Sequence, residues 1–321
     1  MKPRQLGSSE ILVSPVALGC WPIAGMTSLD VNDVDSMKTL HAAIESGVNF
    51  FDTAYGYGIN GESERLVAKA IAGQREKIVI ATKCGLAWDD NGERVLDGRP
   101  ATLKSQIDES LFRLQVDHVE LLYLHAPAPN VAVAESAAAL REIMAAGKAR
   151  LIGVSNFSVQ QLEEFSAECP VSVVQPPYNM LQRTIEAALV PWCQAREVSI
   201  AIYWPLMKGL LAGKLPRDHV FQPSDGRAKY PMFQGKEWKR NQDFVDDLRA
   251  IGEQHGSTVA QLAVRWTLEQ PGITAALCGA KRAYQIEEVA QATSITYDDA
   301  VKTKIQTALD RRGDSTVRGA V

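Results

Sequence analysis

The 321-residue chain lacks the features that would place it in several specialised classes of protein. Nowhere do about 18 apolar residues run together, the length that a membrane-spanning helix needs. The opening segment, residues 1–15, has no apolar stretch of signal-peptide length. The 34 basic residues are balanced by 38 acidic ones without a long run of either sign, so the basic surface of a nucleic-acid-binding protein is missing. We therefore expect a cytoplasmic protein with no membrane or nucleic-acid partner.

Cysteine is also scarce. The five cysteines are odd in number, lie far apart and include no CxxC pair: Cys20, Cys84, Cys169, Cys193 and Cys278. This pattern excludes a disulfide framework and a cysteine zinc site, and it predicts reduced thiols. The histidines show no metal-ligand spacing either, so the sequence predicts no metal site.

What the chain does contain is one repeated pattern, in which a short apolar run ends in polar or glycine residues and an amphipathic helical segment follows. Runs that are apolar nearly throughout are typical of strands buried on both faces of a parallel sheet. Eight segments have this character: residues 16–20, 48–54, 77–83, 119–125, 150–156, 172–178, 198–205 and 274–280. Helical patterns lie between them, among them residues 34–46, 63–72, 102–114, 133–146, 159–168 and 186–196.

Eight strands with intervening helices favour an α/β fold of the (β/α)₈ TIM-barrel type over two halves of a doubly wound sheet. No low-complexity linker divides the chain, so we expect a single barrel domain over residues 1–321. The opening segment predicts a small β-hairpin that turns near Gly7 and covers the bottom of the barrel. A long connection follows the seventh strand, from Met207 to about Asn241, and loops of that length are usually functional or mobile.

One motif suggests a different fold. The segment Gly56–Gly61 matches GxGxxG between a strand and a helix, which is the fingerprint of a dinucleotide-binding Rossmann unit. That fingerprint requires an acidic residue about twenty positions further on, at the end of the next strand. The next strand ends in Lys83 instead, and the motif lies in the second strand–helix unit rather than the first. We therefore reject the Rossmann interpretation.

Active sites of TIM barrels lie at the C-terminal ends of the strands, so polar residues at those ends are the candidates. Asp52 ends the second strand and Tyr57 lies in the loop after it, Lys83 ends the third strand, and His125 ends the fourth. Each residue alone has a structural explanation, such as loop capping, packing or a core histidine. Their arrival on one rim from three consecutive strands indicates a catalytic group.

These residue types suit proton delivery to a carbonyl group. Tyrosine has a pKa near 10, too high for easy proton exchange near neutrality, and a neighbouring ammonium lowers it. We therefore expect Lys83 to lower the pKa of Tyr57 and Asp52 to keep Lys83 charged. An imidazole such as His125 hydrogen-bonds and orients the substrate oxygen.

With these residues in place, nearly the whole chain resembles the aldo-keto reductase superfamily. The motif DTAYGYG at residues 52–58 with GESE at residues 61–64 is similar to the family's second-strand signature, and GVSNF at residues 153–157 to its fifth-strand motif. The resemblance implies that Asp52, Tyr57, Lys83 and His125 form the catalytic tetrad. It further implies NADP (NADPH) as cofactor and a small carbonyl compound or sugar as substrate.

The resemblance also implies a set of cofactor-binding residues. Ser155, Asn156 and Gln175 would hold the nicotinamide carboxamide, and Tyr203 would stack on the ring. The pyrophosphate would follow Pro205, Leu206, Gly209, Leu211 and Lys214. The 2′-phosphate and adenine would lie at Gly279, Lys281, Arg282, Gln285 and Glu288. Glycine and early helix N–H groups suit anions, and the basic pair at residues 281–282 supplies the charge that favours NADP over NAD.

Three further positions bear on the site. Trp21 follows the first strand, and we expect it to face the nicotinamide or the substrate, with Trp88 and Tyr55 as weaker candidates for the substrate wall. Val289 stands where the family commonly has asparagine, so one adenine contact is missing. Trp204 stands where serine is usual, and it changes the phosphate loop or its lid.

The leading hypothesis is an NADP(H)-dependent oxidoreductase with Tyr57 as general acid and base. Two alternatives stay open at this point. Lys83 in an aldolase or isomerase barrel would form a Schiff base, and a regulatory module would hold NADP(H) as a sensor with little turnover. The substrate, the physiological direction and the oligomeric state are not defined by the sequence.

Overall fold

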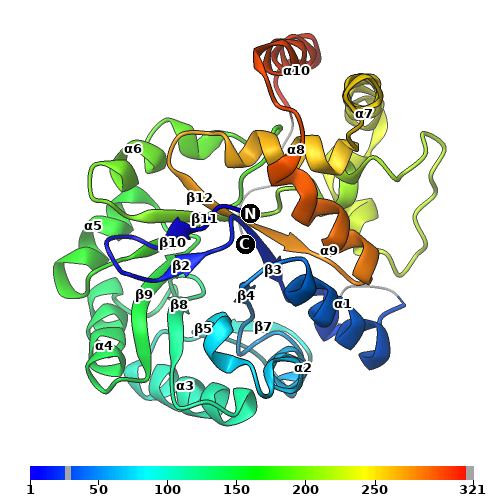
Figure 1. Ribbon diagram of the computed structural model, residues 1–321. Coiled ribbons are helices and arrows are strands. Elements are labelled where there is room, and N and C mark those ends of the chain that lie inside the picture. Colours follow the sequence, from blue (N-terminus) through cyan, green and yellow to red (C-terminus); the bar gives the residue numbers. More distant parts are fainter. Residues whose placement is uncertain (26–29, 316–321) are drawn as a thin grey trace.

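The computed structural model describes residues 1–25 and 30–315 and shows a closed barrel of eight parallel strands ringed by helices (Figure 1). Around the barrel the strands follow the order β10-β11-β12-β3-β4-β5-β8-β9, and each pairs in parallel with both neighbours. All eight predicted strands are present, so the predicted (β/α)₈ fold is confirmed. The closed sheet also confirms that the GxGxxG segment is not part of a Rossmann unit.

The barrel strands are short and almost entirely buried, as their apolar composition requires. They are β3 (Val16–Gly19), β4 (Phe50–Asp52), β5 (Val79–Cys84), β8 (Val119–Leu124), β9 (Ala149–Ser155), β10 (Val173–Gln175), β11 (Ser199–Tyr203) and β12 (Ile273–Gly279). Two antiparallel pairs lie outside the barrel: β1 (Arg4–Gln5) with β2 (Leu12–Val13), and β6 (Leu86–Trp88) with β7 (Arg94–Leu96).

The helices lie outside the strands, with α7 and α10 packed against each other at the periphery (Figure 1). The α-helices are α1 (Asp33–Glu45), α2 (Glu62–Ile71), α3 (Pro100–Leu114), α4 (Val133–Ala145), α5 (Val159–Glu168), α6 (Leu189–Gln194), α7 (Gly235–His255), α8 (Val259–Leu268), α9 (Ala283–Ala290) and α10 (Asp299–Arg312). The 3₁₀ turns are η1 (Pro22–Ala24), η2 (Arg75–Lys77), η3 (Thr184–Glu186), η4 (Met207–Ala212), η5 (Gly226–Lys229), η6 (Pro231–Phe233) and η7 (Gln291–Ser294). Within residues 1–25 and 30–315, no helix has the length and apolar character that crossing a membrane requires.

Several predicted bounds shift by a few residues in the structure, and two segments differ more clearly. The predicted helix over residues 186–196 is reduced to α6, because Pro191 has no N–H to donate and proline is tolerated only in the first turn of a helix. The long connection after the seventh strand ends at Gln234 rather than near Asn241, since α7 begins at Gly235. Asn241 is buried within α7, where its side-chain amide donates to the carbonyl of Met232 at 2.9 Å.

The predicted hairpin covers the N-terminal end of the barrel (Figure 1). Leu6 and Val13 are fully buried and belong to the same apolar cluster as the inward-facing barrel residues Phe50, Tyr123 and Val173. Polar contacts fix the hairpin in place: the N–H of Gly7 donates to Ser199 Oγ at 2.8 Å. The hairpin therefore seals one end and leaves the other end of the strands available for a site.

We predict that Leu6→Ala destabilises the protein by about 2–5 kcal/mol, because it removes a fully buried leucine side chain from the barrel bottom. Equilibrium urea unfolding measures the change in the free energy of unfolding. Leu12→Ala is the matched control, since Leu12 lies in the same hairpin but is 53% exposed, and it should cost less than about 0.5 kcal/mol. Equal losses in the two variants would show that the hairpin does not seal the barrel.

Candidate active site

The four predicted catalytic residues converge at the C-terminal end of three neighbouring strands. Asp52 is the last residue of β4, Lys83 lies near the end of β5, and His125 follows β8 directly. Because β4 pairs with β5 and β5 pairs with β8, these side chains share one sector of the barrel mouth. Tyr57 reaches the same sector from the loop between β4 and α2.

The Lys83 ammonium is the centre of this group. It lies in a buried ion pair with Asp52, donates to the carbonyl oxygen of Thr53 at 2.9 Å, and donates to the Tyr57 hydroxyl at 3.1 Å. The side chains of Lys83 and Asp52 are only 1% and 2% exposed. The other oxygen of Asp52 accepts from Gln175 Nε2 at 2.7 Å. The three donor contacts of Lys83 hold its Nζ directly beside the phenol oxygen.

The electrostatics keep Lys83 charged. Burial alone would lower the pKa of Lys83, but attraction to Asp52 and to Tyr57 outweighs the burial, and the pKa is raised. A lysine that acts as a nucleophile needs the opposite change, a lowered pKa that supplies the free amine. The site therefore presents an ammonium ion as a proton-holding and charge-stabilising group.

Lys83 lowers the pKa of Tyr57 as predicted, but the net pKa is raised, because burial has the larger effect. Burial of the phenol raises the pKa of Tyr57, and the nearby charge of Lys83 offsets only part of that increase. The desolvation cost of a tyrosinate is invisible in the sequence, which shows only that a lysine is near. In this structure Tyr57 is a protonated phenol near neutral pH.

His125 completes the group as a neutral imidazole. Its ring lies 5.8 Å from the Tyr57 ring in an edge-on arrangement. Burial lowers the pKa of His125 well below its ordinary value, and the charges of Lys83 and Arg94 lower it further. The buried Nδ1 atom has no hydrogen-bond partner among the described residues. A buried polar atom without a partner is uncommon, and at a barrel mouth it is typical of a group that meets a ligand.

The glycine-rich loop that carries Tyr57 is shaped by close packing. A Cβ atom at Gly56 would lie 2.9 Å from the carbonyl oxygen of Leu86. At Gly61, which has φ +72°, a Cβ would lie 2.5 Å from Arg113 Cδ. Gly56 is required because the backbone of Leu86 comes too close for a side chain, and Gly61 because of its positive φ and the nearby Arg113. These two needs explain the glycines of the motif without a phosphate ligand.

The GESE motif, residues 61–64, fixes the loop that carries Tyr57 to the barrel. Glu64 is fully buried, accepts from Thr82 Oγ1 at 2.7 Å, and pairs with Arg113 at 3.3 Å. Ser63 Oγ lies 2.8 Å from Thr53 Oγ1. The start of α2 is thus tied to β5 and to the residue after Asp52, so the motif fixes the position of the Tyr57 loop.

The residues predicted to hold the nicotinamide carboxamide lie together at the ends of β9 and β10. Ser155 Oγ donates to the carbonyl of Gln175 at 2.8 Å, and Asn156 Nδ2 donates to the carbonyl of His125 at 3.0 Å. Tyr203, at the end of β11, donates from its hydroxyl to Asn156 Oδ1 at 2.8 Å. The side-chain amide of Gln175 points toward Asp52. This polar set therefore adjoins the tetrad.

The segment predicted to follow the pyrophosphate has an unusual backbone. Trp204, Met207, Lys208 and Gly209 all have positive φ, so the chain turns sharply just beyond β11. Pro205 and Leu211 are buried, Leu206 and Gly209 are partly buried, and Lys214 is exposed. The N–H groups of Gly209 and Leu211 both donate to the carbonyl of Leu206, and Lys214 Nζ lies 3.3 Å from Glu288. The exposed end of this segment is therefore tied to the second half of α9 (Ala283–Ala290).

Most of the residues predicted to bind the 2′-phosphate and adenine of the cofactor lie around the start of α9. Gly279 ends β12 and is exposed, and the N–H of Lys281 donates to Gln285 Oε1 at 2.9 Å. Arg282 makes contacts that the sequence did not reveal: Nη2 donates to the carbonyl of Asp30 at 2.8 Å, and Nε lies 3.6 Å from Asp35. The Arg282 guanidinium is therefore already engaged by the first turn of α1 and the residues before it, where the sequence predicted a contact with a cofactor phosphate.

The two departures from the family pattern have distinct settings. Val289 is buried in α9, 3% exposed, and belongs to the main apolar cluster. Trp204 has φ +62° and packs edge-on against Tyr203, with ring centroids 5.0 Å apart. Lys208 Nζ lies 4.1 Å from the centre of the Trp204 ring, so the tryptophan forms part of the wall beside Tyr203.

Aromatic side chains form the rest of the mouth. Trp21 lies edge-on to Tyr57 with centroids 5.0 Å apart, and it stacks on Trp88 at 6.5 Å. Trp88 Nε1 donates to the carbonyl of Gly56 at 2.8 Å, which holds the β6–β7 hairpin against the Tyr57 loop. Arg94, on β7, lies over both tryptophan rings. Sequence reasoning missed Arg94, because only the pairing of β6 with β7 brings it to the mouth.

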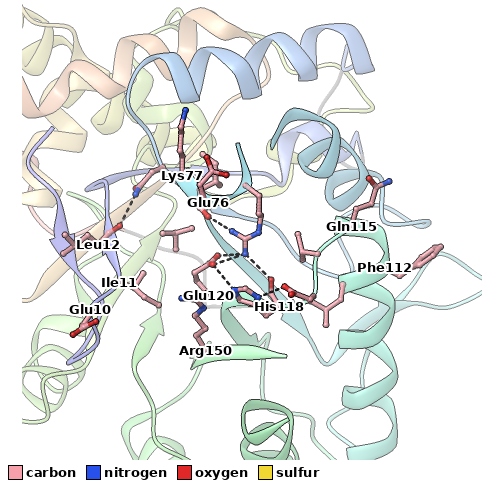
Figure 2. A pocket seen from close by; sticks show the side chains of 17 residues that line it. Glu10, Ile11, Leu12, Glu76, Lys77, Phe112, Gln115, His118, Glu120 and Arg150 are labelled. Carbon is pink, nitrogen blue, oxygen red and sulfur yellow. Dashed lines mark hydrogen bonds and ion pairs between the residues drawn. The ribbon is translucent and has the colours of Figure 1, made fainter. Parts of the chain in front are cut away.

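A pocket at the opposite end of the barrel is not this site (Figure 2). It lies between the N-terminal hairpin, η2 and the end of α3, where the strands begin. Its Glu120 is satisfied within the protein, accepting from Arg75 at 2.9 Å and from the N–H of Ile80 at 2.8 Å. None of the four tetrad residues lines it. In the part of the chain that the structure describes, no cluster of histidine, cysteine, aspartate or glutamate is placed to hold a metal ion.

Comparison with known proteins finds similarity to aldo/keto reductases along nearly the whole chain. The model of the aldo/keto reductase family matches residues 15–310. The aldo-keto reductase YhdN of Bacillus subtilis is 35% identical, over 97% of this chain and 94% of its own length. A protein of Escherichia coli named NADH-specific methylglyoxal reductase is 30% identical, over 94% of this chain and 97% of its own.

A solved structure shares the fold closely. The glycerol dehydrogenase of Gluconobacter oxydans superposes with a TM-score of 0.90 at 32% identity, covering 99% of this chain and 98% of that one. A family match over most of the chain, curated relatives at 30–35% identity and a common barrel all agree. The chain belongs to the aldo/keto reductase family, whose members are oxidoreductases that act on carbonyl and alcohol substrates.

Proposed function

We propose that this protein is an NADP(H)-dependent oxidoreductase that transfers hydride between nicotinamide and the carbonyl or alcohol carbon of an aldehyde, ketone or sugar. Tyr57 is its general acid and base. The observation that carries the proposal is the contact between the Tyr57 hydroxyl and the buried, charged Lys83 at the barrel mouth. An ammonium ion beside a phenol is the arrangement that stabilises tyrosinate after a proton is given away.

The residues around the mouth fit a nicotinamide dinucleotide. Ser155, Asn156 and Gln175 supply hydroxyl and amide groups beside the tetrad, as a carboxamide requires. The start of α9 has no side-chain cap, and the first N–H groups of a helix attract phosphate. Lys281 and Arg282 add positive charge at that helix start. Bound in this way, the nicotinamide would supply or accept the hydride.

The protein's own residues move and hold the proton. The raised pKa of Tyr57 keeps the phenol protonated near neutrality, so that it donates to the carbonyl oxygen as hydride arrives. The tyrosinate that remains lies 3.1 Å from the Lys83 ammonium, and Asp52 keeps that ammonium charged and in place. The neutral imidazole of His125, 5.8 Å from the Tyr57 ring, orients the substrate oxygen by a hydrogen bond.

The aldolase alternative is disfavoured by the same contacts. Schiff-base formation needs an unprotonated, accessible lysine amine. Lys83 is 1% exposed and its pKa is raised by Asp52 and Tyr57 despite its burial. A carbonyl carbon would have to displace either the ion pair or the carbonyl of Thr53 to reach Nζ.

For the cofactor we propose a preference for NADP(H), with Arg282 on the 2′-phosphate. The fork of a guanidinium suits phosphate, and Lys281 precedes it. Asp35 and the carbonyl of Asp30 hold Arg282 in the structure, so a 2′-phosphate would have to compete with the Asp35 carboxylate. This competition reduces the expected preference for NADPH over NADH. One relative is itself named for NADH.

We predict that Tyr57→Phe lowers kcat for carbonyl reduction by about 10²–10⁴-fold, the usual contribution of a positioned general acid. Its affinity for NADPH should stay within about twofold, because the removed hydroxyl contacts Lys83 rather than the residues of α9. Initial rates of NADPH oxidation and fluorescence titration of NADPH measure the two quantities. The substrate panel includes aldoses, small aldehydes and pyridoxal, with methylglyoxal and glycerol added because two relatives are named for them.

Loss of NADPH binding in Tyr57→Phe would contradict the role assigned to the phenol. Negligible rates for the wild type across the panel, with NADPH still bound, would instead favour a nicotinamide sensor with little turnover.

We predict that Arg282→Ala weakens NADPH binding about tenfold or more and leaves NADH within about twofold, because a charged hydrogen bond is worth about 1.5–3 kcal/mol and tenfold is about 1.4 kcal/mol. Asp35→Asn should strengthen NADPH selectively, since it removes the carboxylate that competes for the guanidinium. Titration of both dinucleotides with each variant measures the effects.

Asp33→Asn is the control for Asp35→Asn, because Asp33 carries the same charge in the same helical turn and makes no ion pair with Arg282 in the described residues. Equal changes for NADPH and NADH in Arg282→Ala would rule out the 2′-phosphate contact.

A further inference from the structure

Arg94 occupies a defined place at the mouth of the active site. In the β6–β7 hairpin it is the direct cross-strand partner of Trp88, and directly opposed residues of an antiparallel pair lie on the same face. That face is turned toward the site, because Trp88 Nε1 donates to the carbonyl of Gly56 in the Tyr57 loop at 2.8 Å. Arg94 is therefore held above the tetrad rather than pointing away from it.

The exposed guanidinium of Arg94 lies over two aromatic rings. Its central carbon lies 5.5 Å from the Trp21 ring centre and 5.4 Å from the Trp88 ring centre. Trp21 in turn lies 5.0 Å from the Tyr57 ring, so a single indole separates the cation from the proposed proton donor. Cation–π contact of this kind uses the face of a guanidinium and leaves its N–H edge for an acceptor.

Among the described residues, no acidic side chain forms an ion pair with this cation. Within residues 1–25 and 30–315, Arg94 makes no ion pair and no hydrogen bond, whereas most other arginines are paired, for example Arg75 with Glu120 and Arg99 with Asp97. Its charge reaches the site, since it is one cause of the lowered pKa of His125. An exposed guanidinium that contacts aromatic rings at the mouth of the site matches a carboxylate in charge and in its paired oxygen atoms.

We propose that Arg94 binds a carboxylate on the substrate, so that the site prefers oxo acids, in which the reacting carbonyl lies a few bonds from a carboxylate, over uncharged carbonyl compounds. The inference rests on the proposed function, because it places the reacting carbonyl at Tyr57. In this arrangement the rings of Trp21 and Trp88 pack against the carbon chain, and Arg94 sets which end of the molecule faces outward.

The test compares 4-oxobutanoate with butanal, which share chain length and a reacting aldehyde but differ in the carboxylate. The wild type should show a higher kcat/KM for 4-oxobutanoate. Arg94→Met should reduce that value about tenfold or more and leave butanal within about twofold. Arg94→Lys should fall between, because it keeps the charge but loses the fork. Lys236→Met is the control, since it removes an exposed cation from α7.

A second measurement does not depend on turnover. Butanoate and butanamide are titrated against the tryptophan fluorescence of the wild type and of Arg94→Met, because Trp21 and Trp88 contact the cation. Butanoate should bind the wild type more tightly than butanamide does, and the variant should lose that difference. If neither aldehyde is reduced but this binding pattern holds, the carboxylate site stands and the proposed function fails. Equal kcat/KM values for the two aldehydes in the wild type, or butanoate binding unchanged in Arg94→Met, would overturn the proposal.

Discussion

The buried ion pair between Lys83 and Asp52 is the constraint on which the site depends. An ammonium ion with 1% exposure is tolerated only with good partners, because removing one partner of such a pair leaves an uncompensated charge at a cost of about 3–5 kcal/mol. Asp52, the carbonyl of Thr53 and the Tyr57 hydroxyl are those partners. The phenol is therefore positioned by the same contacts that make the buried charge stable.

The rest of the barrel keeps this pair rigid. Asp52 and Lys83 come from adjacent parallel strands, so the distance between them is fixed by backbone register. Glu64 ties the start of α2 to β5 through Thr82 and to α3 through Arg113. At the other end, the N-terminal hairpin closes the barrel and leaves one open mouth. A site supported by strands and packed loops holds its geometry more precisely than one built on free loops.

Much of this architecture was predictable from the sequence, because strands buried on both faces must be apolar throughout and polar residues at their ends then stand out. Asp52, Lys83 and His125 were found in that way, and Tyr57 by its place in the following loop. The aromatic wall was only partly predictable: Trp21 was expected at the rim, but its contact with Arg94 depends on the pairing of β6 with β7.

Other features depend on burial or tertiary approach and have no local signal. The contact of Arg282 with Asp35 joins α9 to α1 across the outside of the barrel. The direction of the Tyr57 pKa follows from desolvation outweighing a neighbouring charge, and the sequence shows only the charge. The early start of α7 was also not predicted, since Trp238 is the one large apolar residue among residues 235–241 and a single residue makes no apolar helical pattern.

We propose that Tyr57 is held as a phenol by burial and gives its proton beside a charged Lys83. The pH dependence of kcat/KM for the carbonyl substrate tests it most directly, because this quantity reports the ionisation of groups in the enzyme before the substrate binds. With the pKa of Tyr57 raised and that of His125 lowered, kcat/KM for reduction should stay level from pH 7 to pH 9 and decline only above the ordinary tyrosine value of about 10. A decline centred between pH 7 and pH 8 would show that burial does not keep Tyr57 protonated in this range.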